Sequence, residues 1–449
     1  MKNLLRRKID AFLFDWKQRK DHLPLIVKGA RQIGKTCSIK KFAESYKYLI
    51  EINFVTEPQY KTIFENGFVV DEVLKQITMI DPKKKFVAHE TLLFFDELQA
   101  CPNCATSLKF FQLDGRFDVI CSGSLMGINY NEIESNSVGY KEEYEMYSLD
   151  FEEFLWAKGY SDEQVEDLYF HMKNLQPFTQ LEMEVMHSNF KDYMIIGGMP
   201  AIVRTFIDEK NFSGILAKQK RLLADYEEDI TKYAVGLDKA KIKNVYKNIS
   251  TFLAKENKKF QISKIARNAR NRDYIGVNDW LQDAGIVNVC YGLDMPELPF
   301  RANYNATNYK LYFADTGLLI ASLDAESQED LRANKNFNTC KGAIYENIVA
   351  ETLVKSGYQL YYYKNEKSTI EMDFFVRDAN SVVPVEVKAS DNATASLNNL
   401  ISKDIYKEIN YGIKFCNKNI GFNGKFYTFP YFLTFLLHRF MFDKIAQKE

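Results

Sequence analysis

The sequence has no long hydrophobic run and no excess of charge of either sign. Its most apolar C-terminal stretch, residues 431–442, is too short to cross a bilayer and contains His438 and Arg439. The first 20 residues carry charge at both ends and lack the apolar centre of a signal peptide. Because 59 basic residues nearly balance 60 acidic residues, no field of the whole chain attracts nucleic acid or a membrane. We therefore expect a cytoplasmic protein that binds no membrane.

The sequence also lacks the cysteine pattern of a disulfide framework. Its seven cysteines are an odd number and are scattered through apolar stretches, which favours buried thiols. The one C-x-x-C motif, Cys101–Cys104, has no second pair of metal ligands nearby. Pro102 suits the first turn of a helix, so we interpret the motif as structural.

Short apolar runs alternate with helical patterns in the first third of the chain. Residues 1–20 have apolar side chains at helical spacing. The apolar runs that follow lie at residues 25–27, 48–53, 92–95 and 119–121. Such alternation predicts parallel strands joined by crossover helices.

A phosphate-binding motif follows the first of these runs. Residues Gly29–Thr36 match G-x-x-x-x-G-K-[ST], directly after the run at 25–27 and before a helical pattern at 38–46. Backbone N–H groups of such a loop and of the helix N-terminus cradle phosphates. Lys35 is predicted to pair with the β- and γ-phosphates of ATP, and the Thr36 hydroxyl to ligate Mg²⁺. The predicted nucleotide-binding residues are Gly29, Ala30, Arg31, Gln32, Ile33, Gly34, Lys35, Thr36 and Cys37.

The second half of this site is predicted about sixty residues further on. The wholly apolar run at 92–95 reads as a strand buried on both faces, and Asp96 and Glu97 follow it. Asp96 is placed to hold Mg²⁺, and Glu97 to polarise the attacking water, which predicts hydrolysis as well as binding. The run at 119–121 brings Ser122 to the same sheet edge, either near the γ-phosphate or as a plain turn residue. The predicted catalytic residues are Lys35, Glu97 and Ser122, and the predicted metal ligands are Thr36 and Asp96.

Several segments resemble a family of prokaryotic AAA-type ATP-binding proteins. They are GARQIGKT, LLFFDELQ, ICSGSL, NSVGYKEEYEMYSLDFEEFLWA and GGMPAIV. Members join this module to a C-terminal domain of unknown function, and the resemblance runs from about residue 23 to the C-terminus. The family's arginine finger does not carry over, because Tyr140 stands where an Arg is frequent, and Arg116, Arg204 and Arg221 are alternatives. AAA modules commonly build their site between subunits, so a homo-oligomer is an open expectation.

The middle of the chain combines helices with a pattern typical of a winged helix. Residues 151–233 have mostly helical spacing. Two further helical patterns, at 262–269 and 277–284, are separated by a turn and followed by apolar strands at 286–289 and 311–313. A helix–turn–helix with two following strands makes DNA binding the first hypothesis for this region.

The charges in this region argue against reading of bases. The second helix carries Asp279 and Asp283 and no basic residue, so it would bring acids to a phosphate-lined groove. Between Lys239 and Arg272, by contrast, eleven Lys or Arg residues stand against one acid, Glu256. These helices suit contact with the phosphates of DNA or RNA without sequence preference. A structural or partner-docking module is the alternative.

The last hundred residues return to an α/β pattern. A helix is predicted at 342–356, followed by strands at 359–363, 369–376 and 382–388. An acid, Glu346, lies on the helix. The strands carry further charged residues at alternating positions.

Those charged residues resemble the PD-(D/E)xK nuclease fold. Glu371 and Asp373 share one face of the second strand, and Glu386 and Lys388 share one face of the third. Asp373 and Glu386, with Glu346, are predicted to hold a hard divalent cation through oxygen atoms. Lys388 is predicted to orient or deprotonate the water that attacks a phosphodiester. A cross-strand ion pair on a solvated face is the alternative, and loss of cleavage in an intact fold is also open.

These patterns predict an α/β multidomain chain. Its parts are a P-loop AAA-type ATPase core at 1–150, a helical lid or linker at 151–235, a winged-helix-like domain at 236–325 and a restriction-endonuclease-like domain at 335–449. The predicted function is Mg²⁺-dependent ATP binding and hydrolysis coupled to a nuclease-like domain that acts on nucleic acid. The alternative is a non-cleaving signalling or scaffold protein that ATP switches.

Overall fold

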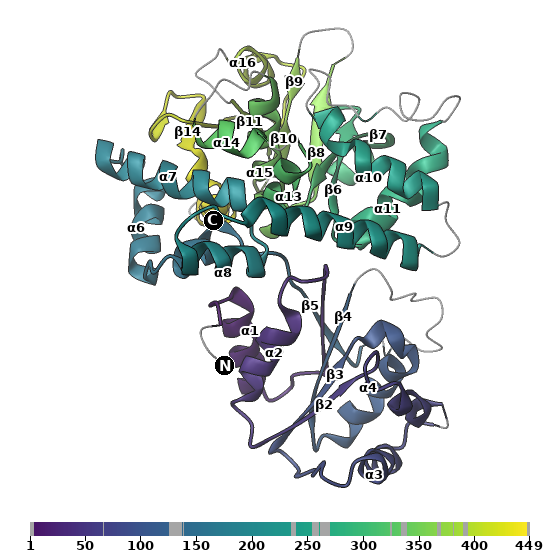
Figure 1. The fold of residues 1–449 in the computed structure, drawn as a ribbon. Helices are drawn as coiled ribbons and strands as arrows, with labels where there is room; N and C mark the ends of the chain where they lie inside the picture. Colours follow the sequence, from purple (N-terminus) through teal and green to yellow (C-terminus); the bar gives the residue numbers. More distant parts are fainter. Residues whose placement is uncertain are drawn as a thin grey trace. The chain divides into compact units, whose positions relative to one another are not determined.

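The computed structural model describes most of the chain (Figure 1). The described residues are 4–65, 67–124, 137, 139–234, 239–253, 260, 270–323, 326–333, 339–365, 370–379, 381–388 and 394–446. They form two compact units, the first comprising Met1–Ser148 and Asp283–Gly285 and the second Leu149–Gln282 and Ile286–Glu449. Within the described ranges, no helix has both the length and the apolar surface that a membrane span requires.

The first unit is built on a five-stranded sheet in which every pairing is parallel, with strand order β2-β3-β4-β1-β5. This confirms the predicted α/β architecture with a parallel sheet. Strand β3 is buried at every position, as its wholly apolar sequence predicts. The strands are β1 (Leu25–Gly29), β2 (Tyr48–Asn53), β3 (Thr91–Asp96), β4 (Asp118–Ser124) and β5 (Glu142–Glu145).

Helices α1 and α4 follow their sequence signals, whereas the helix predicted at 38–46 begins at Lys35 and ends at Ala43. Helix α1 buries Ile9, Leu13 and Trp16, which recur at helical spacing. Helix α4 begins at Pro102, where no N–H is needed, and ends before Gly115, whose φ is 69°. The helices are α1 (Lys8–Gln18), α2 (Lys35–Ala43), α3 (Val70–Ile80) and α4 (Pro102–Asp114), with 3₁₀ segments η1 (Pro58–Phe64) and η2 (Leu98–Ala100).

The second unit opens with a run of helices, as predicted for residues 151–233. Helix α7 begins with a capping box in which Thr179 and Glu182 accept each other's backbone N–H. It ends at Gly197, whose φ is 74°, and a Cβ on Gly198 would lie 2.0 Å from Leu149 O. The helices are α5 (Phe151–Ala157), α6 (Asp162–Lys173), α7 (Gln180–Ile196), α8 (Pro200–Glu209), α9 (Ile215–Tyr233) and α10 (Lys239–Leu253).

Two sheets complete the second unit, with strand orders β7-β6-β8-β9 and β10-β11-β12-β14-β13. Strand β6 pairs antiparallel with β7 and parallel with β8. The strands expected of a winged helix therefore share a sheet with the first strand of the C-terminal region. The strands are β6 (Val287–Leu293), β7 (Tyr304–Phe313), β8 (Leu360–Lys364), β9 (Glu371–Met372), β10 (Phe374–Arg377), β11 (Val382–Val387), β12 (Gly412–Cys416), β13 (Gly421–Phe422) and β14 (Phe426–Pro430).

One predicted strand of this region is wrong in extent. Residues 369–376 do not form a single strand, because the chain passes from one sheet to the other at Asp373. The Asp373 carboxylate accepts a hydrogen bond from Val387 N at 2.8 Å, and β9 and β10 lie on either side. The helix predicted at 262–269 lies outside the described residues. The remaining helices are α11 (Ile275–Asp283), α12 (Phe300–Asn303), α13 (Thr316–Ala321), α14 (Ser327–Arg332), α15 (Thr339–Lys355), α16 (Ala395–Ser402) and α17 (Leu437–Ala446), with 3₁₀ segments η6 (Asn271–Tyr274) and η7 (Tyr431–Leu436).

Candidate functional site

The loop between β1 and α2 requires glycine at both ends. Gly29 has φ 155°, and a Cβ there would lie 2.2 Å from Met146 O. Gly34 caps α2 with φ 96°, a conformation that favours glycine, and the helix begins at Lys35. The helix N-terminus and the loop N–H groups are thus available to an anion. The nine predicted nucleotide-binding residues, from Gly29 to Cys37, lie on this loop and the first turn of α2.

Lys35 folds back over the loop. Its Nζ donates to Gly29 O at 2.9 Å and to Ala30 O at 2.7 Å. Burial lowers the pKa of Lys35 to about 8, and the nearby carboxylates of Glu97 and Asp96 oppose that shift. The ammonium therefore lies in a site where a further negative charge would strengthen its protonated form.

Arg7, which is not among the residues predicted for this site, hydrogen-bonds to the loop. Arg7 is 6% exposed and precedes α1. Its guanidinium donates to Ile33 O at 2.9 Å and to Tyr147 O at 2.7 Å. These contacts span 26 and 140 residues of sequence, so no local motif could have revealed them.

Asp96 is the centre of the polar cluster beside the loop. Its carboxylate accepts from Thr36 Oγ1 at 3.2 Å and from Asn53 Nδ2 at 3.1 Å. It also accepts a hydrogen bond from the buried Ser122 hydroxyl and one from Glu97 N at 3.0 Å. The structure thus brings Thr36, Asp96 and Ser122 together. Asn53 was missed, although its place at the end of β2, in register with Asp96 of β3, would have been a usable signal.

Glu97 lies directly after β3 in a left-handed conformation, with φ 60° and ψ 47°. Non-glycine residues adopt this region at a cost of about 1 kcal/mol or more, and such residues gather at functional sites. Gln99 donates through Nε2 to the Glu97 carboxylate and accepts from Ser124 N at 3.2 Å. Gln99 was also missed, and it fixes the direction of the Glu97 carboxylate relative to the end of β4.

The charged residues predicted in the C-terminal region also come together. Lys388 Nζ lies 3.0 Å from Glu386 Oε1. Burial opposes the charge of Lys388, but Glu386, Asp373 and Glu346 outweigh it and raise the pKa of Lys388. Burial raises the pKa of Glu386. The four predicted residues therefore share one electrostatic environment.

Two further residues of this cluster come from β7. Lys310 is 1% exposed, and its Nζ lies 3.2 Å from Glu346 Oε1 and 3.4 Å from Glu371 Oε1. The Tyr312 hydroxyl donates to the Glu346 carboxylate. Both residues were missed because β7 was assigned to a separate domain. A lysine inside the apolar strand YKLYF was the signal that could have found them.

The fit of a cation to this cluster rests on one oxygen. Glu386 is 2% exposed, and its Oε2 is buried with no hydrogen-bond partner among the described residues. An unpaired buried carboxylate oxygen is a group that a hard cation would satisfy. However, the carboxylate oxygens of Glu346, Asp373 and Glu386 do not all lie within 4.8 Å of one another. A different group of side chains in the described ranges does have this spacing.

Three family models match separate parts of the chain. Residues 21–155 match an AAA domain, residues 187–329 a domain of unknown function (DUF8612) and residues 341–432 another domain of unknown function (DUF4143). No curated protein matches the chain.

Three solved structures that match the chain share little sequence with it. The Walker-type ATPase PABY2304 of Pyrococcus abyssi is 12% identical, with TM-score 0.41, over 71% of this chain and 96% of that chain. The Aeropyrum pernix ORC1 protein in complex with DNA is 11% identical, with TM-score 0.31, over 75% and 94%. C. elegans PCH-2 is 12% identical, with TM-score 0.27, over 46% and 63%. The AAA match covers all five strands of the first sheet, and the prediction of a P-loop ATPase domain is confirmed.

Proposed function

We propose, from the premise that residues 21–155 form a P-loop ATPase domain of the AAA class, that this domain binds Mg²⁺-ATP and hydrolyses it. The observation that carries the proposal is the 3.2 Å contact between Thr36 Oγ1 and Asp96 Oδ2, which lie on different elements. A hydroxyl and a carboxylate are oxygen ligands of the type that Mg²⁺ prefers. Thr36 and Asp96 would hold the ion, and the ion would neutralise charge on the β- and γ-phosphates.

Lys35 changes its hydrogen-bond partners when the triphosphate binds. Its Nζ now donates to two loop carbonyls, and its pKa is lowered to about 8. Phosphate oxygens are stronger acceptors than carbonyls, so Lys35 exchanges these partners for phosphate and regains its ordinary protonation. The N–H groups of Gly34 and of the first turn of α2 add neutral donors around the same charge.

Glu97 and Ser122 are proposed to act in hydrolysis. The Glu97 carboxylate polarises the attacking water, and Gln99 orients that carboxylate through its hydrogen bond. Ser122 bonds to Asp96, so it links the end of β4 to the metal-binding carboxylate. We expect Glu97→Gln to bind ATP as the wild type does and to lose turnover by about 10²-fold or more, because the amide cannot accept the proton. Normal turnover by Glu97→Gln would remove Glu97 from this role.

The C-terminal cluster is proposed to be a metal-dependent nuclease-like site. Asp373 and Glu386 would hold a divalent cation, with Glu346 beside them, and Lys388 would orient or deprotonate the attacking water. The buried, unpaired Oε2 of Glu386 supports this assignment. The cation would activate water and stabilise charge on a phosphodiester, and nucleic acid without sequence preference is the proposed substrate.

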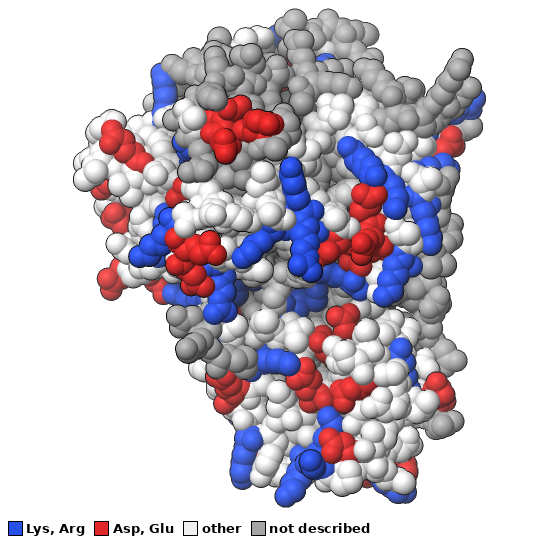
Figure 2. Space-filling model, in the orientation of Figure 1, with Lys and Arg blue, Asp and Glu red and all other residues white. Residues whose placement is uncertain are grey.

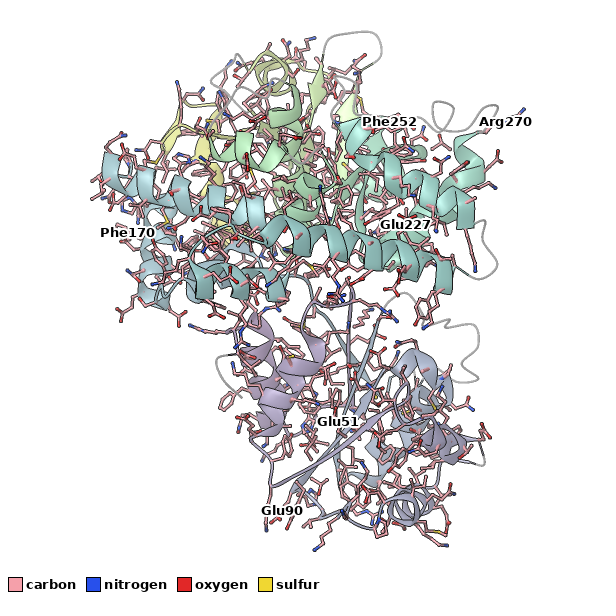
Figure 3. The ribbon with its side chains drawn as sticks, viewed as in Figure 1. Glu51, Glu90, Phe170, Glu227, Phe252 and Arg270 are labelled. Carbon is pink, nitrogen blue, oxygen red and sulfur yellow. The ribbon has the colours of Figure 1, made fainter. Side chains whose placement is uncertain are left out.

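The surface charge gives this substrate limited support. Figure 2 shows Lys and Arg side chains mixed with acids over α9 and α10. On α10, Lys243 Nζ and Lys247 Nζ lie 3.6 Å and 2.8 Å from Oε1 of Glu227 on α9. Figure 3 labels Glu227. An acid that pairs with two lysines reduces the charge available to phosphates. Phosphate contact by Lys243 or Lys247 thus requires these pairs to exchange partners.

The second candidate function is a non-cleaving signalling or scaffold protein that ATP switches. It is favoured by the pairing of the C-terminal carboxylates with protein groups: Glu386 with Lys388, Asp373 with Val387 N, and Glu346 with Lys310. A homo-oligomer in which a neighbour completes the ATP site is compatible with either function.

Cleavage assays separate these two functions. Purified full-length protein is incubated with single- and double-stranded DNA and RNA, with Mg²⁺ or Mn²⁺, and with and without ATP. The nuclease proposal expects cleavage that Asp373→Ala abolishes and Lys388→Ala slows by about 10²- to 10³-fold. The exposed acid Asp404 supplies the matched control, and Asp404→Asn is expected to cleave normally. Cleavage that survives Asp373→Ala would contradict the proposed nuclease site, and no cleavage under any condition would support the scaffold function.

A further inference from the structure

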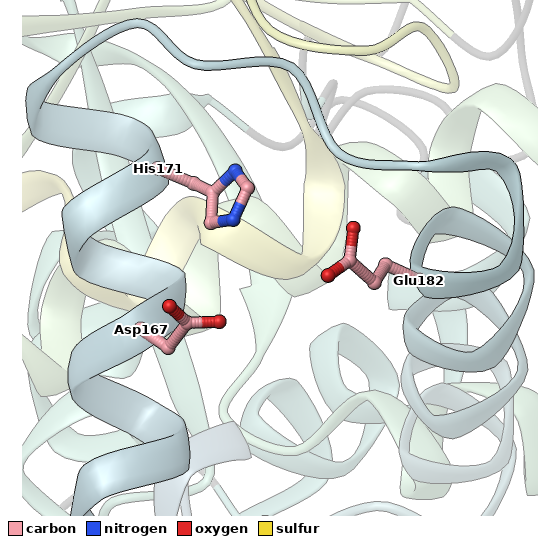
Figure 4. Close-up of side chains that lie close together, drawn as sticks. All are labelled: Asp167, His171 and Glu182. Carbon is pink, nitrogen blue, oxygen red and sulfur yellow. The ribbon is translucent and has the colours of Figure 1, made fainter.

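A group of side chains of the types that bind metals lies in the helical part of the second unit, and it shares no residue with the two sites described above. Asp167 and His171 are one turn apart on α6, and Glu182 lies in the first turn of α7. One ligand atom of each residue lies within 4.8 Å of the other two (Figure 4). Side chains four residues apart share a helix face, so α6 presents Asp167 and His171 to the same point.

The histidine ring is held by stacking and by one hydrogen bond. His171 is 7% exposed, and its ring stacks on Phe178 with centroids 4.3 Å apart. Its Nδ1 lies 2.9 Å from Gln176 O, an acceptor, so the proton is on Nδ1. In the neutral ring the lone pair is then on Nε2, and no residue in the described ranges hydrogen-bonds to Nε2. A metal-bound histidine is commonly oriented in this way, by a carbonyl that accepts from the other ring nitrogen.

Both carboxylates keep an oxygen available. Thr179 donates to Glu182 Oε2 twice, from its N at 2.6 Å and from its Oγ1 at 2.8 Å, and Oε1 is left for another partner. Asp167 is exposed, and among the described residues it makes no hydrogen bond or ion pair.

The group opens onto a pocket between α6 and α7. The pocket has a volume of about 450 Å³, and Asp167 and Glu182 lie on its wall. Apolar side chains, among them Leu168, Phe178 and Met186, line much of the rest, together with Tyr160, Glu163 and Gln164. Water or a small ligand in this pocket can therefore reach an ion held by the three side chains.

We propose that Asp167, His171 and Glu182 bind one divalent transition-metal ion, with Zn²⁺ as the best fit. A single imidazole with two carboxylates suits Zn²⁺, whereas Mg²⁺ and Ca²⁺ prefer oxygen alone. Three protein ligands leave the fourth position of a tetrahedral ion open to the pocket, as in zinc sites that bind a further ligand. The ion joins α6 to α7 across the loop that contains Gln176 and Phe178.

The test is titration of the metal-free, full-length protein with Zn²⁺, measured by calorimetry. The wild type is expected to bind one more Zn²⁺ than Asp167→Asn or His171→Gln, or to bind this Zn²⁺ about 100-fold or more tightly. Loss of a residue that only hydrogen-bonds to a metal ligand already lowers metal affinity by about 10- to 100-fold, so loss of a ligand should cost at least as much. Because His171 is buried, the exposed Asp167→Asn variant guards against a folding defect. Glu163→Gln is the matched control, as Glu163 is exposed and lines the same pocket but is not one of the three ligands.

Spectroscopy gives a second readout. Co²⁺ in place of Zn²⁺ is expected to give the visible absorption of a four-coordinate ion in the wild type and in Glu163→Gln, and not in Asp167→Asn. Equal Zn²⁺ stoichiometry and affinity in wild type and Asp167→Asn would overturn the proposal. So would an unchanged Co²⁺ spectrum in that variant.

Discussion

Lys310 is the residue whose removal tests the C-terminal cluster most sharply. It is fully buried and lies 3.2 Å from Glu346 and 3.4 Å from Glu371. Lys310→Met keeps an unbranched side chain one atom shorter than lysine, and it leaves Glu346 buried and without its positive partner. Loss of one member of a buried ion pair destabilises a protein by about 3–5 kcal/mol. The Tyr312 hydroxyl still donates to Glu346, so we expect the lower end of this range.

Lys364 supplies a matched control. It pairs with the same Glu371 at 2.8 Å, but its side chain is 41% exposed. Exposed pairs contribute about 0–1 kcal/mol, so Lys364→Met should change stability little. A chain with two compact units need not unfold in one step, so hydrogen exchange of peptides from β7 and α15 is the appropriate assay. Equal protection of these peptides in both variants would refute the reasoning.

Three further predictions concern the first unit. ATP affinity should fall about tenfold between about pH 7 and about pH 9. The pKa of Lys35 in the free protein is about 8 and phosphate favours the charged form, so ATP binding above this pKa must take up a proton. Calorimetry that shows equal affinity at both pH values would contradict this prediction. Arg7→Met should destabilise this unit by about 2–3 kcal/mol, because two carbonyls lose charged donors, and thermal unfolding with and without ATP measures it; an unchanged transition would show that Arg7 does not hold the loop. Asn53→Leu should weaken Mg²⁺-dependent ATP binding, because Asp96 loses the 3.1 Å hydrogen bond that orients its carboxylate, while binding without Mg²⁺ should change less; equal losses in both conditions would argue against a metal role for Asp96.

The ATP site was largely predictable because its determinants are local. Loop glycines, a strand with no polar residue and the acids after it are signals within single segments. The partners of Asp96 and Glu97 were not all predictable. Asn53 and Gln99 are ordinary polar residues, and only the register of β2 against β3 and the turn after β3 bring them to these carboxylates.

The C-terminal region was less predictable because its contacts cross between sheets. Alternation in the sequence continued through Asp373, so a single strand was expected, whereas the chain changes sheet there. Lys310 belongs to β7, which pairs with β6, and β6 pairs with β8. No local pattern reports a pairing between strands about seventy residues apart, and the domain boundaries from the sequence stay predictions.

The measurement that tests the central proposal most directly is ATP titration of Lys35→Ala by calorimetry in the presence of Mg²⁺. The proposal predicts that binding is lost in this variant. Lys40→Ala, on the same helix, should bind as the wild type does, since Lys40 pairs with Glu51 at 2.8 Å (Glu51 is labelled in Figure 3). Unchanged ATP affinity in Lys35→Ala would contradict the proposed site and place nucleotide binding elsewhere on the chain.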